Sequence, residues 1–480
     1  MKSKTPARIK NFGRNVSFRV ANHVRVGDEA EVLALLNEKG AGNIRVAGAR
    51  HSWNTAFATR DTLIDLSRLN SVKHFTDPQK RTVVSVGGGC SVNELLDYLG
   101  KKNLSIQGYG IIGKQSIAGA VSTATHGSGH SSLSNQVLAA HIAAYDDRGE
   151  PTTHEFGEQD ESLEAARCAF GCMGIILSLT LVCENRPLVS ERTSKSDSLT
   201  EMLAEADSYP LQQFYLVPFA WKWYAQLRKT VDKGRSSPAA RRWYYFRRFW
   251  KIEILFNLCV KLLANIPGLH RLFPAFFRQT YAGLRAENQE FTDHADKLLM
   301  MKDDLFRHVE MELFVATERL PEAASFVEGF LRWCAGETPD NFGAISQIVS
   351  AHGDKEELAG LKEELAGLKG TYLHHYPITF RRVLKDDTMM SMTHDGEAYA
   401  ISFINYSFRR VTFETAMRFL ASVMAAAFGA RPHWGKWMPL DGHEIQKLYP
   451  RLEEFREQCE TIDKDGVFRN RFIDRKLWVS

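Results

Sequence analysis

Cysteine is scarce in this chain, and the few cysteines present form no recognisable framework. Seven cysteines are scattered over 480 residues. An odd number at irregular spacing makes a set of structural disulfides improbable and fits a reducing compartment better. Cys168 and Cys172 lie close together in an apolar stretch with no second pair of ligands nearby, which favours burial over metal binding. The sequence therefore predicts a cytoplasmic protein without a metal site.

Long apolar runs and a strong net charge are missing as well. No uninterrupted apolar segment reaches the roughly 20 residues that span a bilayer. The nearest stretch, from Ile252 to Ile266, is interrupted by Glu253 and Lys261. The basic N-terminus is followed by no apolar run, so we expect no secretory signal. The formal net charge is only +4, which gives no reason to expect a nucleic acid as a partner.

The composition that is present is that of a soluble globular protein. Hydrophobic residues make up 44% and charged residues 25% of the chain, and the length allows two or three domains. Helix starts are predicted at Asp28 and at the capping-box sequence Ser91-Val-Asn-Glu94. Apolar strands are predicted at 43–46, 82–86, 138–145 and 174–182. Strands mixed with helices over the first part of the chain predict an α+β domain.

The stretch 228–278 differs from the rest of the chain. It is rich in Arg, Lys, Trp, Tyr and Phe, and only Asp232 and Glu253 oppose its positive charge. A basic, aromatic, amphipathic segment can lie on an anionic membrane surface. The alternative is a helical part of a second domain whose basic face is solvated. Both interpretations stay open at this stage.

Three glycine-rich segments carry the first chemical signal. They are AGARHS (47–52), GGGCS (87–91) and ATHGSG (124–129). Small residues let backbone N–H groups approach a ligand closely, and several such loops in one domain suggest a large ligand with phosphates. The segment 108–113 matches G-x-G-x-x-G, but no long apolar strand precedes it and no acidic residue follows at the required distance. We therefore do not predict a Rossmann dinucleotide site.

Two of these loops and a distant motif together resemble a known family. AGARHSW (47–53) and SIAGAVSTATHGSG (116–129) resemble the two flavin loops of the vanillyl-alcohol oxidase superfamily, in its aldonolactone oxidase and alditol oxidase branch. Near the other end, RPHWGK (431–436) resembles the HWGK signature of that branch. The resemblance covers the first 185 and the last 60 residues well and is loose between them.

The resemblance implies an α+β fold with a two-part FAD-binding domain of the PCMH type. Residues 1–187 would form its N-terminal part, and residues 425–480 would return to it. Residues 188–424, which include 228–278, would form a cap that closes over the flavin as the substrate domain. Apolar strands near 310–316 and 399–405 suit the sheet of such a cap.

The resemblance also implies the cofactor site, with FAD bonded covalently to His51. The residues expected to bind the cofactor are Ala47, Gly48, Ala49, Arg50, His51, Ser52, Gly110, Ser116, Gly119, Thr123, Thr125, His126, Gly127, Ser128, Gly129, Ile176, His433 and Asn470. Gly110 matches a position where a small residue leaves room for oxygen beside the flavin, which favours an oxidase.

Three residues are implied in catalysis. Lys436 of the HWGK motif would place a positive charge where negative charge develops on reduction of the flavin. Arg381 matches the arginine of a Glu-x-Arg pair in the family, but Thr379 stands at the position of the glutamate. Threonine cannot act as a general base near neutral pH. Glu310 is the substitute that we would test.

The implied function is oxidation of a CH–OH group of a sugar, lactone, alditol or more apolar alcohol, as in a D-arabinono-1,4-lactone oxidase. Ile111, Ser402 and Ile404 replace polar polyol contacts of alditol oxidases, which predicts a more apolar pocket and a small-molecule alcohol with a lipid or aromatic part. Molecular oxygen is the expected acceptor. The alternatives are a dehydrogenase that uses a quinone or a protein acceptor, and a catalytically inactive flavin-bound protein associated with a membrane.

Overall fold

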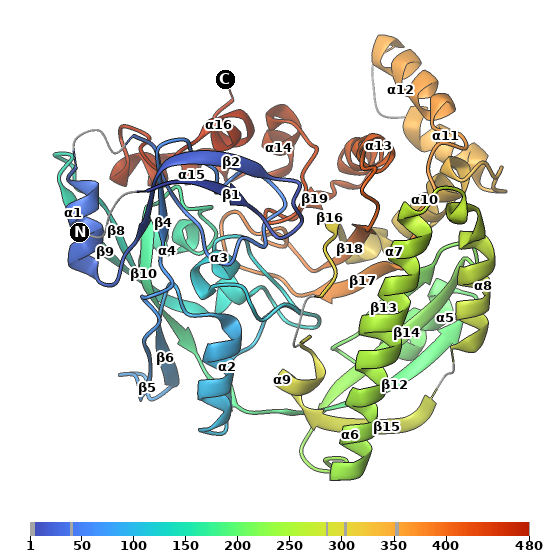
Figure 1. Ribbon diagram of the computed structural model, residues 1–480, viewed down its shortest axis with the longest axis horizontal. Helices are drawn as coiled ribbons and strands as arrows, with labels where there is room; N and C mark the ends of the chain where they lie inside the picture. The colour runs from blue at the N-terminus through green and yellow to red at the C-terminus, as the bar shows by residue number, and fades with distance from the viewer. Residues whose placement is uncertain (1–4, 39–41, 285–286, 302–304, 351–354, 480) are drawn as a thin grey trace.

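The fold is given by a computed structural model that describes the chain except residues 1–4, 39–41, 285–286, 302–304, 351–354 and 480. Side chains are also not described for 5, 287–289, 350 and 355–359. The N-terminal part lies on one side of the molecule and the cap on the other (Figure 1). The last helices of the chain lie back across the N-terminal part. The arrangement is the predicted α+β fold with a two-part FAD domain.

Two sheets form most of the N-terminal part. The first has the order β1-β2-β4-β3 and contains β1 (Thr5–Lys10), β2 (Ser17–Arg25), β3 (Ile44–Val46) and β4 (Thr62–Asp65). The second has the order β5-β6-β10-β8-β9 and contains β5 (Val72–Thr76), β6 (Thr82–Gly87), β8 (Val137–Tyr145), β9 (Pro151–Gly157) and β10 (Ile175–Val182). A short pair, β7 (Leu104–Ser105) and β11 (Glu184–Asn185), completes this part. The strands predicted here are confirmed.

The cap is built on one antiparallel sheet of eight strands in the order β15-β12-β14-β13-β17-β18-β16-β19. Its members are β12 (Leu188–Ser196), β13 (Gln213–Val217), β14 (Lys222–Val231), β15 (Glu287–His294), β16 (Val309–Ala316), β17 (Ile378–Val383), β18 (Ala398–Asn405) and β19 (Arg431–Pro432). In chain order, the first of these strands is β12, which begins at Leu188. The last strand carries the start of the HWGK motif, so the motif enters the site from the edge of this sheet.

Helices cover the sheets on both sides of the molecule. Those of the N-terminal part are α1 (Glu29–Leu36), α2 (Val92–Gly100), α3 (Ile117–Val121), η1 (Leu133–Gln136) and α4 (Glu161–Ala166). Those of the cap are α5 (Leu199–Ala206), α6 (Pro238–Arg247), η2 (Arg248–Phe256), α7 (Asn257–Asn265), η3 (Leu269–Leu272), α8 (Phe273–Gly283), α9 (Ala295–Leu298), η4 (Thr317–Arg319), α10 (Leu320–Cys334), α11 (Phe342–Ser350), α12 (Lys355–Gly367) and α13 (Val411–Phe428). The last three are α14 (Gly442–Leu448), α15 (Leu452–Ile462) and α16 (Arg471–Leu477).

The sequence signals for helix starts and stops act as expected at most points. Asp28 accepts a hydrogen bond from the Glu31 N–H, and Ser91 with Glu94 forms a complete capping box. Near the C-terminus, the chain ends α14 at Leu448 and begins α15 at Leu452. Pro450 lies between them, and a proline disfavours a helical conformation in the residue before it.

One helix of the described chain is long and apolar enough to cross a membrane. This is α13, rather than the stretch 252–266 that comes nearest in the sequence. Its 18 residues are more than half buried within the protein. Phe413, Met417, Leu420 and Met424 are among them and belong to the main hydrophobic core. The helix is therefore a core helix of the cap.

The C-terminal segment is joined to the N-terminal sheet by directed hydrogen bonds. The Ile44 N–H donates to the Val467 carbonyl, and the Asn43 side chain donates to the Arg469 carbonyl. Buried Arg45 donates to the carbonyls of Phe468 and Phe170. The bonds to Val467, Phe468 and Arg469 connect positions more than 400 residues apart and hold the two ends of the chain around one site.

Candidate active site

A cavity of about 1160 Å³ lies between the N-terminal part and the cap. Cavities that hold one drug-sized ligand are roughly 300–1,000 Å³, so this space can take a large cofactor together with a substrate. It extends from the glycine-rich loops past the ends of β16, β17 and β18 to η2 and α8. The predicted flavin loops and the HWGK motif therefore face one common space.

Close contact between backbone segments shapes the cofactor end of the cavity. A Cβ atom on Gly48 would lie 1.9 Å from the Ser116 hydroxyl oxygen, so only glycine allows the two loops to meet. Arg50 has φ of 61°, a left-handed conformation that turns the chain just before His51. Ser116 begins α3 by accepting a hydrogen bond from the Gly119 N–H. The loops are thus held in a defined shape by their own contacts.

Hydrogen bonds hold the HWGK motif against strand β16 on one side and against Asn54, next to the first flavin loop, on the other. The His433 and Trp437 N–H groups donate to the carbonyls of Glu312 and Glu310 on β16. The Asn54 side chain donates to the carbonyls of Trp434, at 2.5 Å, and Lys436, at 3.0 Å. The loop therefore bridges the cap strand and the first flavin loop, and this bridging places the Lys436 side chain.

Most of the predicted site residues line the cavity. They are Ala47, Gly48, Ala49, Arg50, His51, Ser52, Gly110, Ser116, Gly119, Thr123, Thr125, His126, Ile176, Glu310, Arg381, His433 and Lys436. Gly127, Ser128, Gly129 and Asn470 lie outside its described lining. Asn470 instead caps α16 and donates to the carbonyls of Thr55, Ala56 and Ala58. These contacts hold the segment that directly follows the first flavin loop.

The His51 ring is partly buried and lies near positively charged groups. Burial, the nearby His308, Lys114 and Lys436 together lower the pKa of His51 to about 4, so its imidazole is neutral near pH 7. The ring stacks on Phe12 with centroids 5.0 Å apart. Its Nδ1 atom is buried and has no hydrogen-bond partner in the described structure. A neutral, oriented imidazole with an unused nitrogen is suited to form a bond to a ligand.

Other buried polar atoms along the cavity are also without hydrogen-bond partners in the part of the chain that the structure describes. They include the Thr125 hydroxyl, the Arg381 Nε and the Glu312 Oε2. Buried polar atoms of native proteins are nearly always paired, so a group of such atoms around one space indicates a polar ligand. Together with the glycine contacts, they fit a bound flavin nucleotide.

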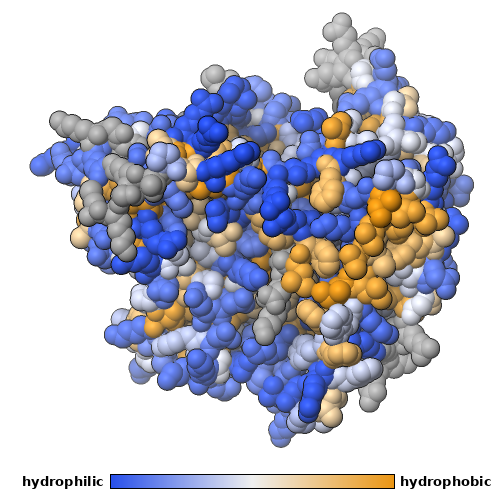
Figure 2. All heavy atoms as spheres, viewed as in Figure 1, coloured by the Kyte–Doolittle hydropathy of each residue, from blue (hydrophilic) through white to orange (hydrophobic). Residues whose placement is uncertain are grey.

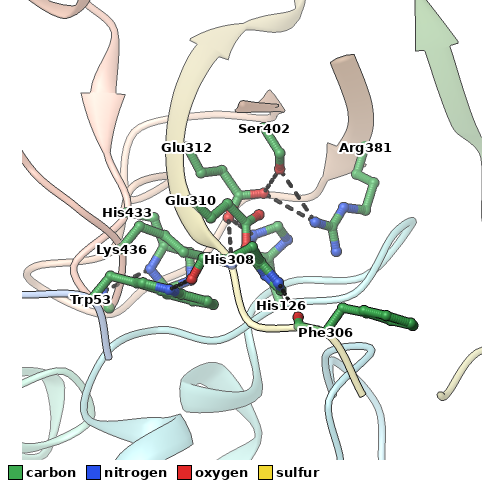
Figure 3. Close-up of polar contacts among 11 residues, drawn as sticks. Trp53, His126, Phe306, His308, Glu310, Glu312, Arg381, Ser402, His433 and Lys436 are labelled. Carbon is green, nitrogen blue, oxygen red and sulfur yellow. Dashed lines mark hydrogen bonds and ion pairs between the residues drawn. The ribbon is translucent and has the colours of Figure 1, made fainter. Parts of the chain in front are cut away.

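Two carboxylates and two cations lie close together in the cavity lining (Figure 3). The carboxylates belong to Glu310 and Glu312, and the cations belong to Arg381 and Lys436. Lys436 Nζ donates to Glu310 Oε2, and the ammonium lies 3.9 Å from Glu312 Oε2. The same ammonium lies 4.8 Å from the centre of the Trp53 ring, at a cation–π distance. All these side chains are largely buried, so their charges act through little solvent.

Glu312 connects this pair to Arg381. Arg381 Nη2 donates to Glu312 Oε1 at 3.2 Å, and the Ser402 hydroxyl donates to the same oxygen at 2.6 Å. Burial alone would raise the pKa of Glu312. Lys436, His126 and Arg381 outweigh burial and hold that pKa well below its usual value. Glu312 is therefore ionised near neutral pH and balances positive charge of Arg381 and Lys436.

Sequence reasoning missed Glu312, although its signal was present. Glu310 and Glu312 alternate with apolar residues in β16, so both side chains leave the strand on its cavity face. Ser402 on β18 lies between Thr379 on β17 and Glu312 on β16 in the strand register. Position 379 has no carboxylate, and Arg381 is instead contacted by Glu312, which lies two strands away on β16.

Two histidines complete the centre. Ligand atoms of His126, Glu312 and His433 lie within 4.8 Å of one another, a spacing that a metal ion could use. The His433 Nδ1, however, accepts a hydrogen bond from the Gly435 N–H at 2.9 Å. Arg381 and Lys436 already neutralise the glutamate and would repel a dication. We interpret the group as a hydrogen-bonding cluster, and the absence of a metal stays a prediction.

The remainder of the cavity has two unlike walls. On the sheet, Gln213, Tyr215, Gln226, Arg228 and Glu191 form a chain of hydrogen bonds between 2.6 and 2.9 Å long. The lining from η2, α8 and the segment after α9 includes apolar side chains, which we call the apolar wall, together with the charged Arg248, Lys251 and Glu253. The apolar wall consists of Ile252, Phe256, Phe277, Leu305 and Phe306. The apolar pocket expected from the sequence stays a prediction.

Comparison with known proteins decides the family. The model of the family described as D-arabinono-1,4-lactone oxidase matches residues 182–476, and that of the FAD binding domain matches residues 21–149. This chain belongs to the D-arabinono-1,4-lactone oxidase family of FAD-dependent oxidases. Members of this family act on CH–OH groups of alcohols or lactones, so the predicted enzyme class and the FAD cofactor are confirmed.

Three named relatives span a range of similarity. A long-chain alcohol oxidase from an uncultured marine euryarchaeote is 37% identical over 97% of this chain and 96% of its own length. An L-gulonolactone oxidase from Mus musculus is 24% identical over 94% of this chain and 93% of its own length. A D-arabinono-1,4-lactone oxidase from Eremothecium gossypii is 33% identical over 65% of this chain and 66% of its own length.

A solved structure confirms the fold. Cholesterol oxidase from B. sterolicum superimposes with a TM-score of 0.74 over 99% of this chain and 97% of its own, at 16% sequence identity. At that identity the likeness concerns the arrangement of the chain, which is the two-domain FAD-binding architecture expected from the sequence.

Proposed function

We propose that this protein oxidises the CH–OH group of a long-chain primary alcohol to an aldehyde. The observation that carries this proposal is the charged centre of Glu310, Glu312, Arg381 and Lys436 at the flavin end of a cavity with an apolar wall. The charged end suits the reacting hydroxyl, and the apolar wall suits an alkyl chain. The name of the archaeal relative supports the same substrate class.

Each residue of the charged centre has a role that follows from its charge and its position. Glu310 lies on the cavity lining with one oxygen bonded to Lys436, and we assign it as the acceptor of the hydroxyl proton. Glu312 is held anionic and bonded to both Arg381 and Ser402, so it positions the guanidinium. Arg381 and Lys436 supply fixed positive charge where negative charge develops. The chemistry that FAD supplies when bound is acceptance of a hydride from the carbon and delivery of both electrons to oxygen, which forms hydrogen peroxide.

Covalent attachment of the flavin through His51 is part of the proposal. The neutral ring, its stacking on Phe12 and the unpartnered Nδ1 support it, because only an unprotonated nitrogen can form the bond. Oxygen as the acceptor is supported by Gly110, which lines the cavity without a side chain. The alternative of a catalytically inactive flavin-bound protein depended on the missing glutamate at position 379. Two carboxylates on β16, those of Glu310 and Glu312, line the cavity and argue against this alternative.

Peripheral membrane contact through 228–278 and a cytoplasmic location are further proposals from the sequence. Within this stretch, residues 238–265 and 269–278 are helical. The expectation of a solvated basic face describes this segment incompletely, since many of its exposed residues are large and apolar.

A substrate series tests the proposed function. We expect kcat/KM for primary alcohols to rise with chain length, by up to about tenfold for each two methylenes, as the alkyl chain is buried against the apolar wall. One hydrogen peroxide should form for each aldehyde. Xylitol and an aldonolactone are the matched polar substrates. A preference for either of them over dodecanol would contradict the substrate class, and aldehyde formation without peroxide would favour the dehydrogenase alternative.

A further inference from the structure

The helices α6, η2 and α7 follow one another without a break and form a rod along the outside of the cap (Figure 1). Large apolar side chains along this rod and at its C-cap are exposed to solvent, each by 40–63%: Trp243, Phe246, Trp250, Ile252, Leu255, Leu258, Leu262 and Ile266. Successive members are in contact at the N-terminal end, where the ring centroids of Trp243 and Phe246 lie 5.9 Å apart. Soluble proteins rarely expose a continuous apolar surface of this size without a partner.

Neighbouring segments extend this surface, which we call the apolar face. Leu272, Leu305, Phe408 and Val411 are also exposed. Lys261 on α7 lies 5.6 Å from the Phe306 ring and 5.7 Å from the Phe408 ring, which joins these segments to the rod. Figure 2 shows hydrophobic side chains gathered near the upper end of the rod and beside it.

The helical segment that forms most of the apolar face has a charge of one sign. Glu253 is the only acidic residue between 238 and 284, and it is buried beside Arg248 at 3.5 Å. The same segment carries exposed Arg242, Lys251 and Arg271. Aromatic and aliphatic side chains bordered by Arg and Lys match the surface of an anionic bilayer, whose headgroups attract the cations while its acyl region accepts the apolar groups. A protein partner would more often meet both signs of charge at the rim.

The apolar face is continuous with the cavity. Ile252 and Leu305 are each about half exposed and also line the cavity, as does exposed Lys251. The cavity therefore reaches the outside within the apolar face. The π-helical segment η2 supplies residues to both, since Glu253 and Phe256 line the cavity while Leu255 is exposed on the face.

We propose that the apolar face docks on an anionic lipid bilayer and that the alcohol passes from the bilayer directly into the cavity. Docking places the opening at Ile252 and Leu305 against the acyl region, where a long-chain alcohol is concentrated. The hydroxyl then reaches the charged centre while the chain follows the apolar wall. The passage of alcohol depends on the proposed function, whereas docking depends only on the surface.

Vesicle flotation tests docking. The probe is phosphatidylcholine vesicles with and without phosphatidylserine, and the variant is W243S/W250S/L258S, whose three positions lie outside the cavity lining. We expect the wild type to float with the anionic vesicles and to be released by high salt. The triple variant should bind about tenfold less. F75S is the matched control, because Phe75 is 41% exposed on β5 of the N-terminal part.

Activity of the same proteins tests the passage of alcohol. With a water-soluble short alcohol, the triple variant should match the wild type within about twofold. With hexadecanol in anionic vesicles, it should lose about tenfold in rate. Wild type that does not float, or a triple variant that floats equally well, would overturn docking. Concentration-dependent dimers that the triple substitution abolishes would assign the face to a second copy instead. If the wild type floats but oxidises no alcohol, docking stands and the proposed function fails together with the passage of alcohol.

Discussion

Replacing Glu310 by glutamine is expected to lower kcat/KM for an alcohol by about two to four orders of magnitude, the usual contribution of a positioned general base. Glutamine keeps the shape of the side chain and can still accept a hydrogen bond from Lys436, but it cannot take the hydroxyl proton. Glu312, at 3.9 Å, still balances the lysine charge, so the site should stay folded and loaded. Steady-state oxidation of decanol under air measures the loss.

Two other glutamates serve as comparisons for this variant. E322Q removes a surface carboxylate that pairs with Arg319, and such pairs contribute little, so activity should not change. E312Q removes the anion between Arg381 and Lys436, so it should raise KM and disturb the Arg381 position as well as lowering kcat. Activity of E310Q within about twofold of the wild type would show that another group accepts the proton.

Replacing His51 by alanine is expected to abolish covalent attachment of the flavin completely. The pKa of His51 is lowered to about 4, so the imidazole is neutral and reactive throughout the neutral range and becomes protonated only in acid. Alanine offers no nitrogen in its place. The acid-precipitated variant should be colourless, while the wild-type precipitate should be yellow and its intact mass should include FAD.

Noncovalent FAD should still bind to this variant, because the Gly48–Ser116 contact and the loop 116–129 are unchanged. H270A is the matched control, since His270 is exposed in the cap outside the cavity lining, and its precipitate should stay yellow. A yellow precipitate from H51A would place the bond on a different residue, with His126, His308 and His433 on the same cavity lining as the alternatives.

The parts of the site that depend on local sequence could be predicted. The first flavin loop follows a short strand, and its conformation depends on nearby residues such as Gly48 and Arg50. The HWGK motif likewise carries its own pattern, which placed Lys436 in the site. Family resemblance supplied the pairing of these two distant segments, because nothing in residues 47–53 alone indicates a contact with residues 433–436.

The parts that depend on strand pairing could not be predicted. Sequence reasoning looked for the missing carboxylate beside Arg381 on the same strand and named Glu310 as a substitute. The group that contacts Arg381 is Glu312, which reaches it because β18 pairs with both β16 and β17. Register between strands is a property of the folded sheet, so the role of a second glutamate in an apolar strand is visible only in three dimensions.

The exposed surface of the cap lay beyond prediction for a different reason. The sequence showed that 228–278 is basic and aromatic, and its helical character was one of the two expected alternatives. Which side of a helix is buried depends on where its neighbours lie. In the fold, Val260 and Asn257 face inward while Leu258 and Leu262 remain outside. The position of the cavity opening within this surface also depends on the sheet beneath it.

Anaerobic mixing of the purified protein with decanol tests the central claim most directly. Oxidation of the alcohol at the charged centre requires that the visible flavin absorbance is lost in one fast phase and returns when oxygen is admitted. The slow variant E310Q should show the same loss of absorbance at a rate about two to four orders of magnitude lower. A flavin spectrum that does not change with any primary alcohol would contradict the assignment of this cavity as an alcohol oxidase site.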